Sequence, residues 1–395
     1  MHLLREIIPL SRLVPVIAVR QGNPKNVQTI ADLLRVEVAL TNPDAAAIGK
    51  ITRERLTKSG EWAALEKHTR VFKPTVNDVA NDIKLGTVDA GIIWNATVSQ
   101  YPELELVRVA DLASVDQQVA IGLLEFSEQP TAALRFARYL GARDRGLKEF
   151  ASYGYEPVEG DVWAETPEVV LFSGGVNRMA IDETIEHFEK REGARVTRVY
   201  NGCGLLVSQM KSGQRPDAYF ACDTSFMYEV TNLFSDPVII SATELVLLLP
   251  KGNPKSIRTL ADLAGTGLRI GVANEAQSAL GALTARLLKA QGLLERVMAN
   301  VRVQTPTADL LVNQMRTGSL DAVVVYAANT SQVREVFTMV PLSGLGATAI
   351  QPFAIGKNSE HRFLMERLLA TLREADSRKK FEATGFQWRA EGSRR

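Results

Sequence analysis

A serine and two glycines stand where an apolar run gives way to a helical pattern. Residues 168–175 read EVVLFSGG, and residues 177–193 repeat apolar side chains at helical spacing. Backbone N–H groups at the start of a helix lack partners and the helix dipole favours negative charge, so this junction suits anion binding. Ser173 adds a hydroxyl donor. The alternative is a polar turn residue before Gly174.

The two cysteines are the other residues with reactive chemistry. Cys203 and Cys222 end predicted strands of one region, and they could form a disulfide or face a ligand, although two separate buried thiols are the simplest interpretation. A nucleophilic Cys203 would need a neighbouring base, and His187 falls on a predicted helix surface. The four histidines are scattered, and no G-x-S-x-G, H-E-x-x-H or Walker A motif occurs. The sequence therefore predicts no enzyme, no metal and no cofactor.

An internal repeat organises the chain around these residues. QGNPKNVQTIADL (21–33) returns as KGNPKSIRTLADL (251–263), and the alignment continues until residues 70–99 fall beside 302–331. This is the signature of a duplicated domain. In each copy a proline ends the predicted strand. Thr and Asp three residues apart then resemble a capping box, which marks the start of a helix.

Strand and helix patterns alternate along both copies. Strands are predicted at 16–19, 168–175, 195–200, 217–223, 245–249, 269–273, 301–304 and 321–327, and helices at 177–193, 205–213, 281–292 and 307–318. The alternation predicts α/β layers around a mainly parallel sheet.

The two copies differ at their N-terminal ends. The segment 153–168 is the predicted boundary between an incomplete unit, 1–163, and a complete unit, 164–395. Residues 168–223 have no counterpart in the first unit, because Met1 aligns with about Thr231. Either the true start lies upstream, or the protein works with one and a half units.

The order of motifs from residue 169 onward resembles the periplasmic solute-binding proteins of ABC transporters, and within them the molybdate/tungstate-binding family. The segments that carry the resemblance are LFSGGVNRMAIDETIEHFEK, YNGCGLLVSQMKSGQRPDAYFACD, LVLLLPKGNP, GVANEAQSALGALTARLL and TGSLDAVVVYAANTS. The resemblance covers 169–395, and also 7–163 as a copy without the first part of its N-terminal lobe. It implies a periplasmic-binding-protein-like, two-lobed α/β fold, with lobe 1 at 169–240 plus 341–395 and lobe 2 at 243–340.

The resemblance also implies a ligand and a site. A tetrahedral oxyanion, molybdate or tungstate, would be held between the lobes by hydroxyls and backbone N–H groups. The ligand-binding positions carried over are Ser173, Asn201, Gly202, Cys203, Ser278, Thr307 and Tyr326. In the family, the loop that corresponds to residues 201–203 is rich in serine. Because these serines are replaced here, the identity of the anion stays open. Helix caps are the alternative for Ser278 and Thr307, and a core tyrosine is the alternative for Tyr326.

The corresponding positions of the first unit read differently. Ala46, Thr75 and Trp94 replace Ser278, Thr307 and Tyr326. Because tryptophan has no hydroxyl, we expect the first unit not to bind the same anion.

Composition argues against some classes of partner. Lys+Arg 46 against Asp+Glu 45 gives a net charge of +1, which argues against nucleic-acid binding. No apolar run approaches about 18 residues, so no membrane insertion is expected. The resemblance implies a monomer that delivers its oxyanion to ABC transporter membrane subunits in the periplasm or another extracytoplasmic space. The first residues read as a strand and not as a signal peptide, so a truncated N-terminus is one of the two alternatives.

Two other functions stay open from the sequence. One is a ligand-sensing regulatory module on the same fold, inside the cell or in the periplasm. The other is binding of sulfate or another oxyanion.

Overall fold

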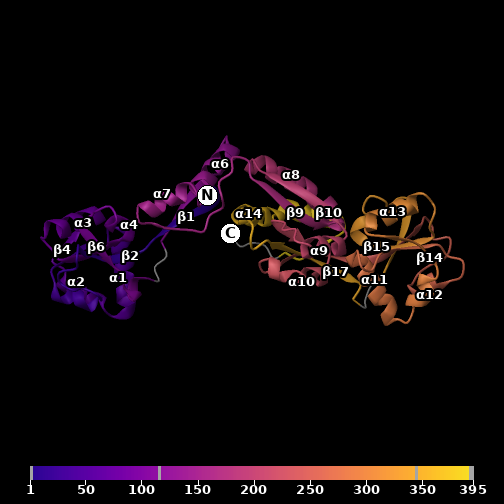
Figure 1. The fold of residues 1–395 in the computed structure, drawn as a ribbon, viewed down its shortest axis with the longest axis horizontal. Helices are drawn as coiled ribbons and strands as arrows, with labels where there is room; N and C mark the ends of the chain where they lie inside the picture. Colours follow the sequence, from indigo (N-terminus) through magenta and orange to yellow (C-terminus); the bar gives the residue numbers. More distant parts are fainter. Residues whose placement is uncertain (1–2, 114–116, 343–345, 391–395) are drawn as a thin grey trace. The chain divides into compact units, whose positions relative to one another are not determined.

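The computed structural model describes residues 3–113, 117–342 and 346–390, and the chain divides into two compact units, Met1–Trp163 and Ala164–Arg395 (Figure 1). Both units consist of sheets flanked by helices, which confirms the predicted α/β class. Among the described residues, no helix is long and apolar enough to cross a membrane.

Lobe 1 of the second unit is built from two stretches of sequence. Strands β10, β9 and β11 are parallel, and β17 joins β11 in the antiparallel sense. In Figure 1 the magenta elements of 168–235 share this lobe with yellow elements near the C-terminus. Its elements are β9 (Glu168–Gly174), η2 (Gly175–Asn177), α8 (Arg178–Glu192), β10 (Arg195–Asn201), α9 (Cys203–Lys211), β11 (Ala218–Phe220), α10 (Thr224–Tyr228), η3 (Thr231–Leu233), β17 (Thr348–Ile355), α14 (Arg362–Leu372), α15 (Ala375–Ala383) and β18 (Gln387–Trp388).

Lobe 2 repeats the scheme with its own parallel strands. β14 and β15 flank β13 in parallel, and β12 (Val238–Pro250) pairs with β17 in lobe 1 and then with β15 and β16 in lobe 2. One strand therefore belongs to both lobes. The other elements are η4 (Ala261–Ala264), β13 (Ile270–Ala273), α11 (Ala279–Ala290), α12 (Leu294–Met298), β14 (Val301–Thr305), α13 (Ala308–Arg316), β15 (Ala322–Tyr326), η5 (Ala327–Thr330) and β16 (Phe337–Pro341).

The first unit contains a sheet with the topology of lobe 2. Its strand order is β4-β3-β5-β2-β6, which matches β14-β13-β15-β12-β16 position by position. This shared order supports the duplication read from the sequence. The elements are β2 (Pro15–Arg20), η1 (Ala31–Arg35), β3 (Val38–Thr41), α1 (Ala47–Ser59), α2 (Trp62–His68), β4 (Val71–Lys73), α3 (Val76–Leu85), β5 (Ala90–Trp94), α4 (Asn95–Val98), β6 (Leu104–Val107) and α5 (Ala110–Ala113).

The rest of the first unit is a three-stranded antiparallel sheet, β7-β1-β8, with two helices, which we call the half-lobe. It comprises β1 (Leu4–Leu13), β7 (Gln117–Leu124), α6 (Pro130–Leu140), α7 (Gly146–Ser152) and β8 (Glu156–Pro157). β1 pairs with β7 and β8 as β12 pairs with β17 and β18, and a register shift falls before Ser11 in one copy and before Ser241 in the other. The half-lobe therefore corresponds to the part of lobe 1 that follows β11.

The repeated Gly-Asn-Pro turn forms the same structure twice, and the predicted helix start after it leads only into a short 3-10 helix. Asp262 Oδ2 accepts from Thr259 N at 2.9 Å and Thr259 Oγ1 accepts from Asp262 N at 3.3 Å, which are the reciprocal bonds of a capping box. Only a single 3-10 turn follows, because Gly265 leaves the helical conformation three residues after Asp262.

Candidate functional site

The carboxyl ends of the parallel strands of the two lobes face each other. Five segments follow these ends: 173–177, 201–204, 274–278, 305–309 and 326–329, which we call the cleft segments. Ligands of open α/β sheets bind outside the carboxyl ends of the strands. The cleft segments contain several hydroxyl and amide side chains and no lysine or arginine.

The two lobes are in contact across these segments. Gly204 N donates to Gln277 O at 3.1 Å, from lobe 1 to lobe 2. A Cβ on Gly202 would lie 2.3 Å from Gln277 O and 2.4 Å from Pro306 O, distances that no side chain could accept. The structure therefore holds the lobes closed, and glycine at 202 allows that approach.

Ser173 is buried inside β9 and its hydroxyl points to its own lobe. Its Oγ donates to Gly174 O at 3.3 Å and accepts from Asn177 Nδ2 at 3.4 Å. Both distances exceed those of strong hydrogen bonds, so little energy holds the hydroxyl in place. In this arrangement Ser173 supports the turn at 174–177, and its rotation would be required for direct contact with a ligand.

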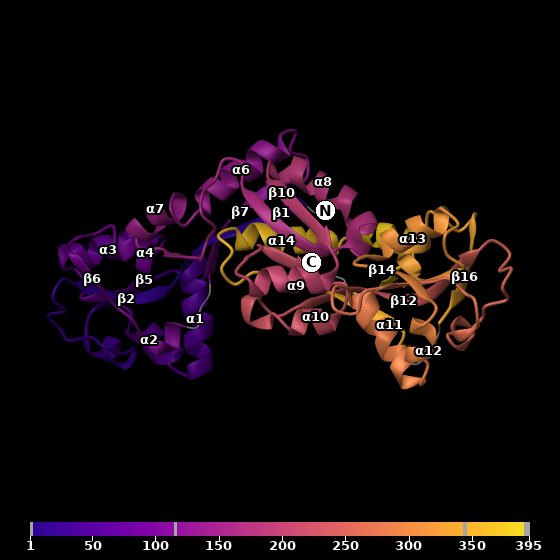
Figure 2. The same cartoon turned by 45° about the vertical axis from the view of Figure 1, so that its right-hand side comes forward.

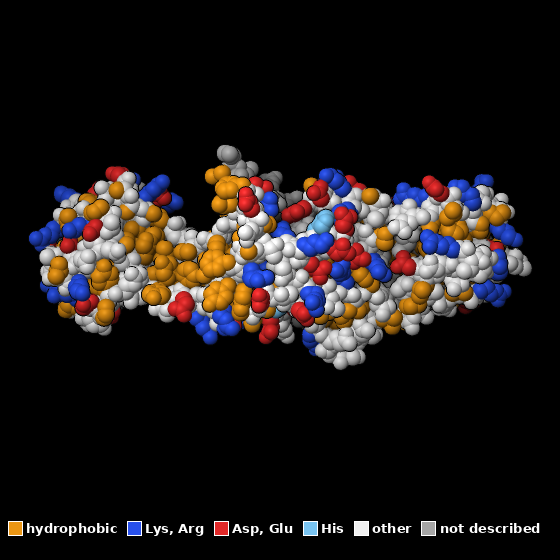
Figure 3. Space-filling view, turned by 90° about the horizontal axis from the view of Figure 1, so that it is seen from above, with side chains coloured by type: hydrophobic (Ala, Val, Ile, Leu, Met, Phe, Trp, Pro, Cys, Tyr) orange, Lys and Arg blue, Asp and Glu red, His pale blue; other side chains and the backbone are white. Residues whose placement is uncertain are grey.

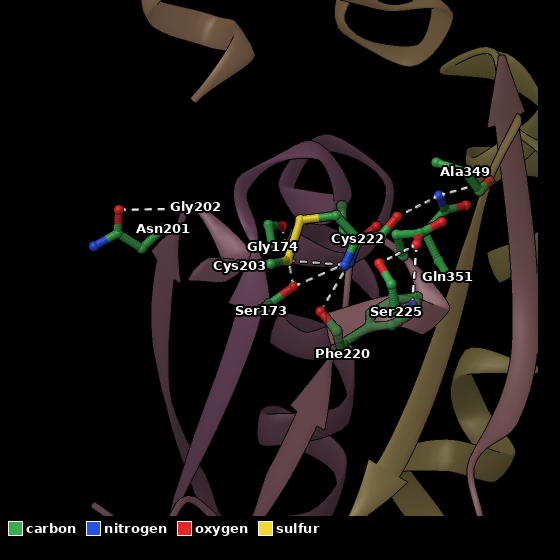
Figure 4. Close-up of a disulfide and its surroundings, with 12 residues drawn as sticks. Ser173, Gly174, Asn201, Gly202, Cys203, Phe220, Cys222, Ser225, Ala349 and Gln351 are labelled. Carbon is green, nitrogen blue, oxygen red and sulfur yellow. Dashed lines mark hydrogen bonds between the residues drawn. A yellow bond between two sulfur atoms is a disulfide. The ribbon is translucent and has the colours of Figure 1, made fainter. Parts of the chain in front are cut away.

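Cys203 and Cys222 form a disulfide, so the expectation of two separate buried thiols is wrong (Figure 4). Their Cα atoms lie 6.4 Å apart because β10 and β11 flank β9 and end at the same edge. Cys222 N also donates to Cys203 Sγ at 3.0 Å, and a Cβ on Gly174 would meet Cys222 Sγ. The disulfide therefore ties the turns after β10 and β11 together, and the turn at Gly174 packs against it.

Asn201 and Gly202 complete the loop that the resemblance assigned to the ligand. Asn201 ends β10, and its Oδ1 accepts from Gly202 N at 2.9 Å. Figure 4 shows the Asn201 side chain directed away from the disulfide. Gly202 is the N-cap residue of α9, with no side chain to cap it. Neither residue brings a side-chain hydroxyl, so this loop offers backbone N–H groups.

Ser278 and Thr307 occupy N-cap positions without capping their helices. Neither side chain accepts a hydrogen bond from the first turn of α11 or α13. The equivalent Thr75 of the first unit does so, in a capping box with Asp78. The capping interpretation of Ser278 and Thr307 is therefore wrong, and both helix starts at the cleft lack a side-chain cap.

Tyr326 ends β15 and its hydroxyl is buried without a hydrogen-bond partner. The residue is 2% exposed. Burial, and then the negative charge of Asp223 and the nearby Tyr219, raise the pKa of Tyr326 well above its ordinary value, so the hydroxyl keeps its proton and remains a donor. An unpartnered buried hydroxyl costs about 1–3 kcal/mol, so it calls for an explanation.

Several polar residues of this region were not expected from the sequence. Asn177 is fully buried, with Nδ2 bonded to Ser173 and to Phe220 O, while its Oδ1 has no partner. Gln351 donates to Cys222 O and Ala349 O, both at 3.0 Å. These are single amides in apolar surroundings, and their role depends on strands that are distant in sequence, so no local pattern could have identified them.

One carboxylate lies at the mouth of the cleft. Asp309 Oδ1 accepts from Asn329 Nδ2 at 2.8 Å, and Oδ2 lies 3.8 Å from the Cβ position of Gly175. Neighbouring protein atoms displace water from the carboxylate and raise the pKa of Asp309, although the residue is still reached by solvent. Among the described residues, no group of three or more His, Cys, Asp or Glu could hold a metal ion.

The first unit lacks these features at the same positions. Trp94 ends β5 with nearly the backbone angles of Tyr326, and it carries no hydroxyl. Ala46 precedes α1, and the hydroxyl of Thr75 is used by its own helix. The candidate site therefore has no equivalent set of donors in the described part of this unit.

Comparisons with known proteins agree with this architecture. The sequence matches the family described as bacterial extracellular solute-binding protein over residues 2–156 and 169–387. The molybdate-binding proteins ModA of Mycobacterium bovis and Mycobacterium tuberculosis are each 26% identical over 223 residues, covering 55% of this chain and 84% of theirs. The periplasmic molybdate-binding protein of Azotobacter vinelandii superposes with a TM-score of 0.50 at 16% identity, covering 56% of this chain and 99% of its own. The last comparison concerns the fold alone.

Proposed function

The chain belongs to the family of bacterial extracellular solute-binding proteins, and we propose that residues 164–395 bind a small tetrahedral oxyanion between their two lobes. Molybdate or tungstate is the favoured ligand, because relatives of this chain are molybdate-binding proteins. We further propose delivery to the membrane subunits of an ABC transporter from the periplasm or another extracytoplasmic space. The relatives are named as binding proteins, and we propose that this chain likewise catalyses no reaction.

The observation that carries the proposal is the buried, unpartnered hydroxyl of Tyr326. It requires an acceptor, and its raised pKa keeps it a donor at neutral pH. An oxyanion supplies strong acceptor oxygens without a proton to place. Because Tyr326 ends β15 and begins the cleft segment 326–329, we propose that an anion in the cleft satisfies its hydroxyl.

Helix starts supply further donors around the same space. α9, α11 and α13 begin directly after cleft segments, and none has a side-chain cap. Their first N–H groups and their dipoles favour an anion. We propose that these N–H groups and Tyr326 hold the ligand, with Ser278 and Thr307 as additional hydroxyl donors and Ser173 and Asn201 as supports of their loops.

The site uses neutral donors, and this bears on the choice of anion. No lysine or arginine occurs in the cleft segments, and Asp309 adds a negative charge at the mouth. Such a site selects by size and by the number of donors, since all tetrahedral dianions carry the same charge. By the resemblance, Asn201, Gly202 and Cys203 stand where the family has serines, so sulfate and other oxyanions are included in the test.

Calorimetry of the full chain tests the ligand. Molybdate, tungstate, sulfate and phosphate are titrated separately into the oxidised protein. We expect saturable binding of molybdate or tungstate with one site per chain. Saturable binding of sulfate alone would keep the oxyanion class and change the ligand, and no binding of any of the four would refute the proposal.

A glycine pair tests whether binding occurs between the closed lobes. Gly202→Ala places a methyl group 2.3 Å from Gln277 O only when the lobes are closed, and the backbone at 202, with φ −63°, accepts alanine. We therefore expect normal folding and a large loss of affinity. Gly175→Ala is the matched control, because its Cβ would have only ordinary contacts at 3.8 Å. Equal affinities of the two variants would place the ligand elsewhere.

A further inference from the structure

Asn201 and Gly202 form an asparagine–glycine pair in the loop that follows β10. No other asparagine of the chain precedes a glycine. In such a pair the backbone nitrogen of the glycine can attack the side-chain amide of the asparagine, because glycine has no side chain to hinder the approach. Asn-Gly is for this reason the dipeptide that loses its side-chain amide most readily. The reactivity of this pair therefore depends on how the fold holds the two groups.

The structure places the two reacting groups next to each other. Asn201 Oδ1 accepts from Gly202 N at 2.9 Å, so the side-chain carbon that carries Oδ1 lies beside the nitrogen that would attack it. In the part of the chain that the structure describes, Gly202 N donates to no other acceptor, and Asn201 Nδ2 donates to none. Asn201 is half-buried, so water reaches it. No hydrogen bond to a third residue has to break before the reaction.

Closure of the lobes requires glycine at this position. α9 of lobe 1 and α11 of lobe 2 lie next to each other across the cleft (Figure 2), where Gly204 N donates to Gln277 O at 3.1 Å. A Cβ at residue 202 would lie 2.3 Å from Gln277 O and 2.4 Å from Pro306 O. A side chain at residue 202 would slow the attack on Asn201, but the lobes could not close around it. The fold therefore leaves the reactive nitrogen unprotected.

We propose that Asn201–Gly202 is a site of spontaneous deamidation and that the modified chain no longer binds the oxyanion. The second part rests on the proposed function of residues 164–395. Gly202 N loses its proton and bonds to Asn201 Cγ, and the Cγ–Nδ2 bond breaks with release of ammonia. Water then opens the cyclic imide. Attack of water at Cγ gives aspartate, and attack at the backbone carbonyl of residue 201 gives isoaspartate.

Either product places a carboxylate in a part of the cleft that has no cation to balance it. The cleft segments contain no lysine or arginine, and charges of both signs are interspersed over the face of the second unit seen in Figure 3. The new charge stands directly before α9, whose first N–H groups are proposed donors to the anion. It repels a dianion and competes for the same N–H groups. Isoaspartate also adds a methylene group to the backbone beside Gly202, where the lobes are in contact.

Peptide mass spectrometry of the full chain tests the modification. Freshly purified protein is incubated in weakly alkaline buffer, and the mass change from amide to carboxylate is followed at each asparagine. We expect residue 201 to convert faster than any other asparagine, giving both aspartate and isoaspartate. Asn201→Gln keeps an amide and should stop the conversion, because its longer side chain forms a cyclic imide far more slowly. An unmodified residue 201, or faster conversion of another asparagine, would overturn the proposal.

Calorimetry with molybdate, tungstate, sulfate and phosphate tests the consequence. Asn201→Asp reproduces one product and should raise the dissociation constant of the bound anion by more than about tenfold, because like charges repel in a partly buried site. Asn358→Asp is the matched control. It adds the same charge to an exposed turn after β17, where Gly356 N donates to Asp217 O at the end of β11 away from the cleft, and it should leave affinity unchanged.

The two measurements separate the two proposals. Equal affinities of folded Asn201→Asp and Asn358→Asp would overturn the consequence of the modification. An unaltered chain that binds none of the four anions would refute the proposed function and that consequence with it. The mass of residue 201 is measured without any ligand, so it decides the modification independently.

Discussion

Tyr326→Phe tests the Tyr326 hydroxyl in two roles, as a buried unsatisfied group in the free protein and as a hydrogen-bond donor to the ligand. The substitution removes a buried O–H that has no partner in the free protein and leaves the ring in place. The free protein should therefore become more stable, by about 1 kcal/mol, because an unsatisfied polar group no longer has to be buried. Affinity for the oxyanion should fall for the opposite reason, since the anion loses a donor.

The size of the expected loss of affinity follows from the negative charge of the oxyanion that accepts the hydrogen bond. A hydrogen bond to a charged group contributes about 1.5–3 kcal/mol, which corresponds to a dissociation constant raised roughly 10- to 150-fold. Titration calorimetry measures this ratio directly. Thermal unfolding with and without ligand measures it again, because ligand-induced stabilisation depends on the logarithm of ligand concentration over Kd.

Tyr200→Phe, on β10 of lobe 1, is the matched control. The Tyr200 hydroxyl donates to Asp182 at 2.5 Å, away from the cleft segments. Its removal should lower stability and leave affinity unchanged, which is the reverse of the Tyr326 result. If Tyr326→Phe binds the oxyanion as tightly as the unaltered chain, the hydroxyl does not contact the ligand and the proposed site is wrong.

Three further substitutions or treatments test the framework of the second unit. Reduction of the Cys203–Cys222 disulfide, which closes a short loop, should lower the free energy of unfolding by about 3 kcal/mol and weaken oxyanion binding, measured by denaturant titration and calorimetry in reductant. Arg367→Ala leaves the fully buried carboxylate of Glu192 without this ion pair and should cost about 3–5 kcal/mol in denaturant unfolding; a cost below 1 kcal/mol would contradict the burial argument. Hydrogen bonds from two backbone N–H groups and a threonine hydroxyl hold the pKa of Asp262 below its ordinary value. This stabilisation is present above the unfolded pKa of about 3.9 and is lost as pH falls through the folded value, so the destabilising effect of Asp262→Asn should be constant near neutral pH and shrink in acid.

The fold could be predicted from sequence because its determinants are local. Short apolar runs and the helical spacing of residues 177–193 gave the strands and α8, which ends at Gly193 in the left-handed conformation as expected. The length of the helix at Asp262 could not be predicted, since a capping box specifies a start and carries no information on length. Gly265, three residues later, sets the end.

The site was harder to predict from the sequence than the fold, because its properties depend on which strands are neighbours. The disulfide required β10 and β11 to flank β9, an order that no spacing in the sequence reveals. Tyr326 was identified by resemblance, but only the structure reveals that its hydroxyl lacks a partner. Asn177 was missed because a single asparagine at a helix start is ordinary in any surface turn, and its complete burial follows from the packing of lobe 1.

Strand β12 serves both lobes, and this has a mechanical consequence. Residues 238–244 are bonded to β17 and residues 245–250 to β15 and β16, so opening of the lobes must act as torsion on one continuous backbone. A sheet resists torsion away from its preferred right-handed twist. If the proposed oxyanion is bound by closure of the lobes, its affinity includes an elastic contribution from this strand, and sequence changes near Thr243 and Glu244 would tune that affinity without touching the ligand.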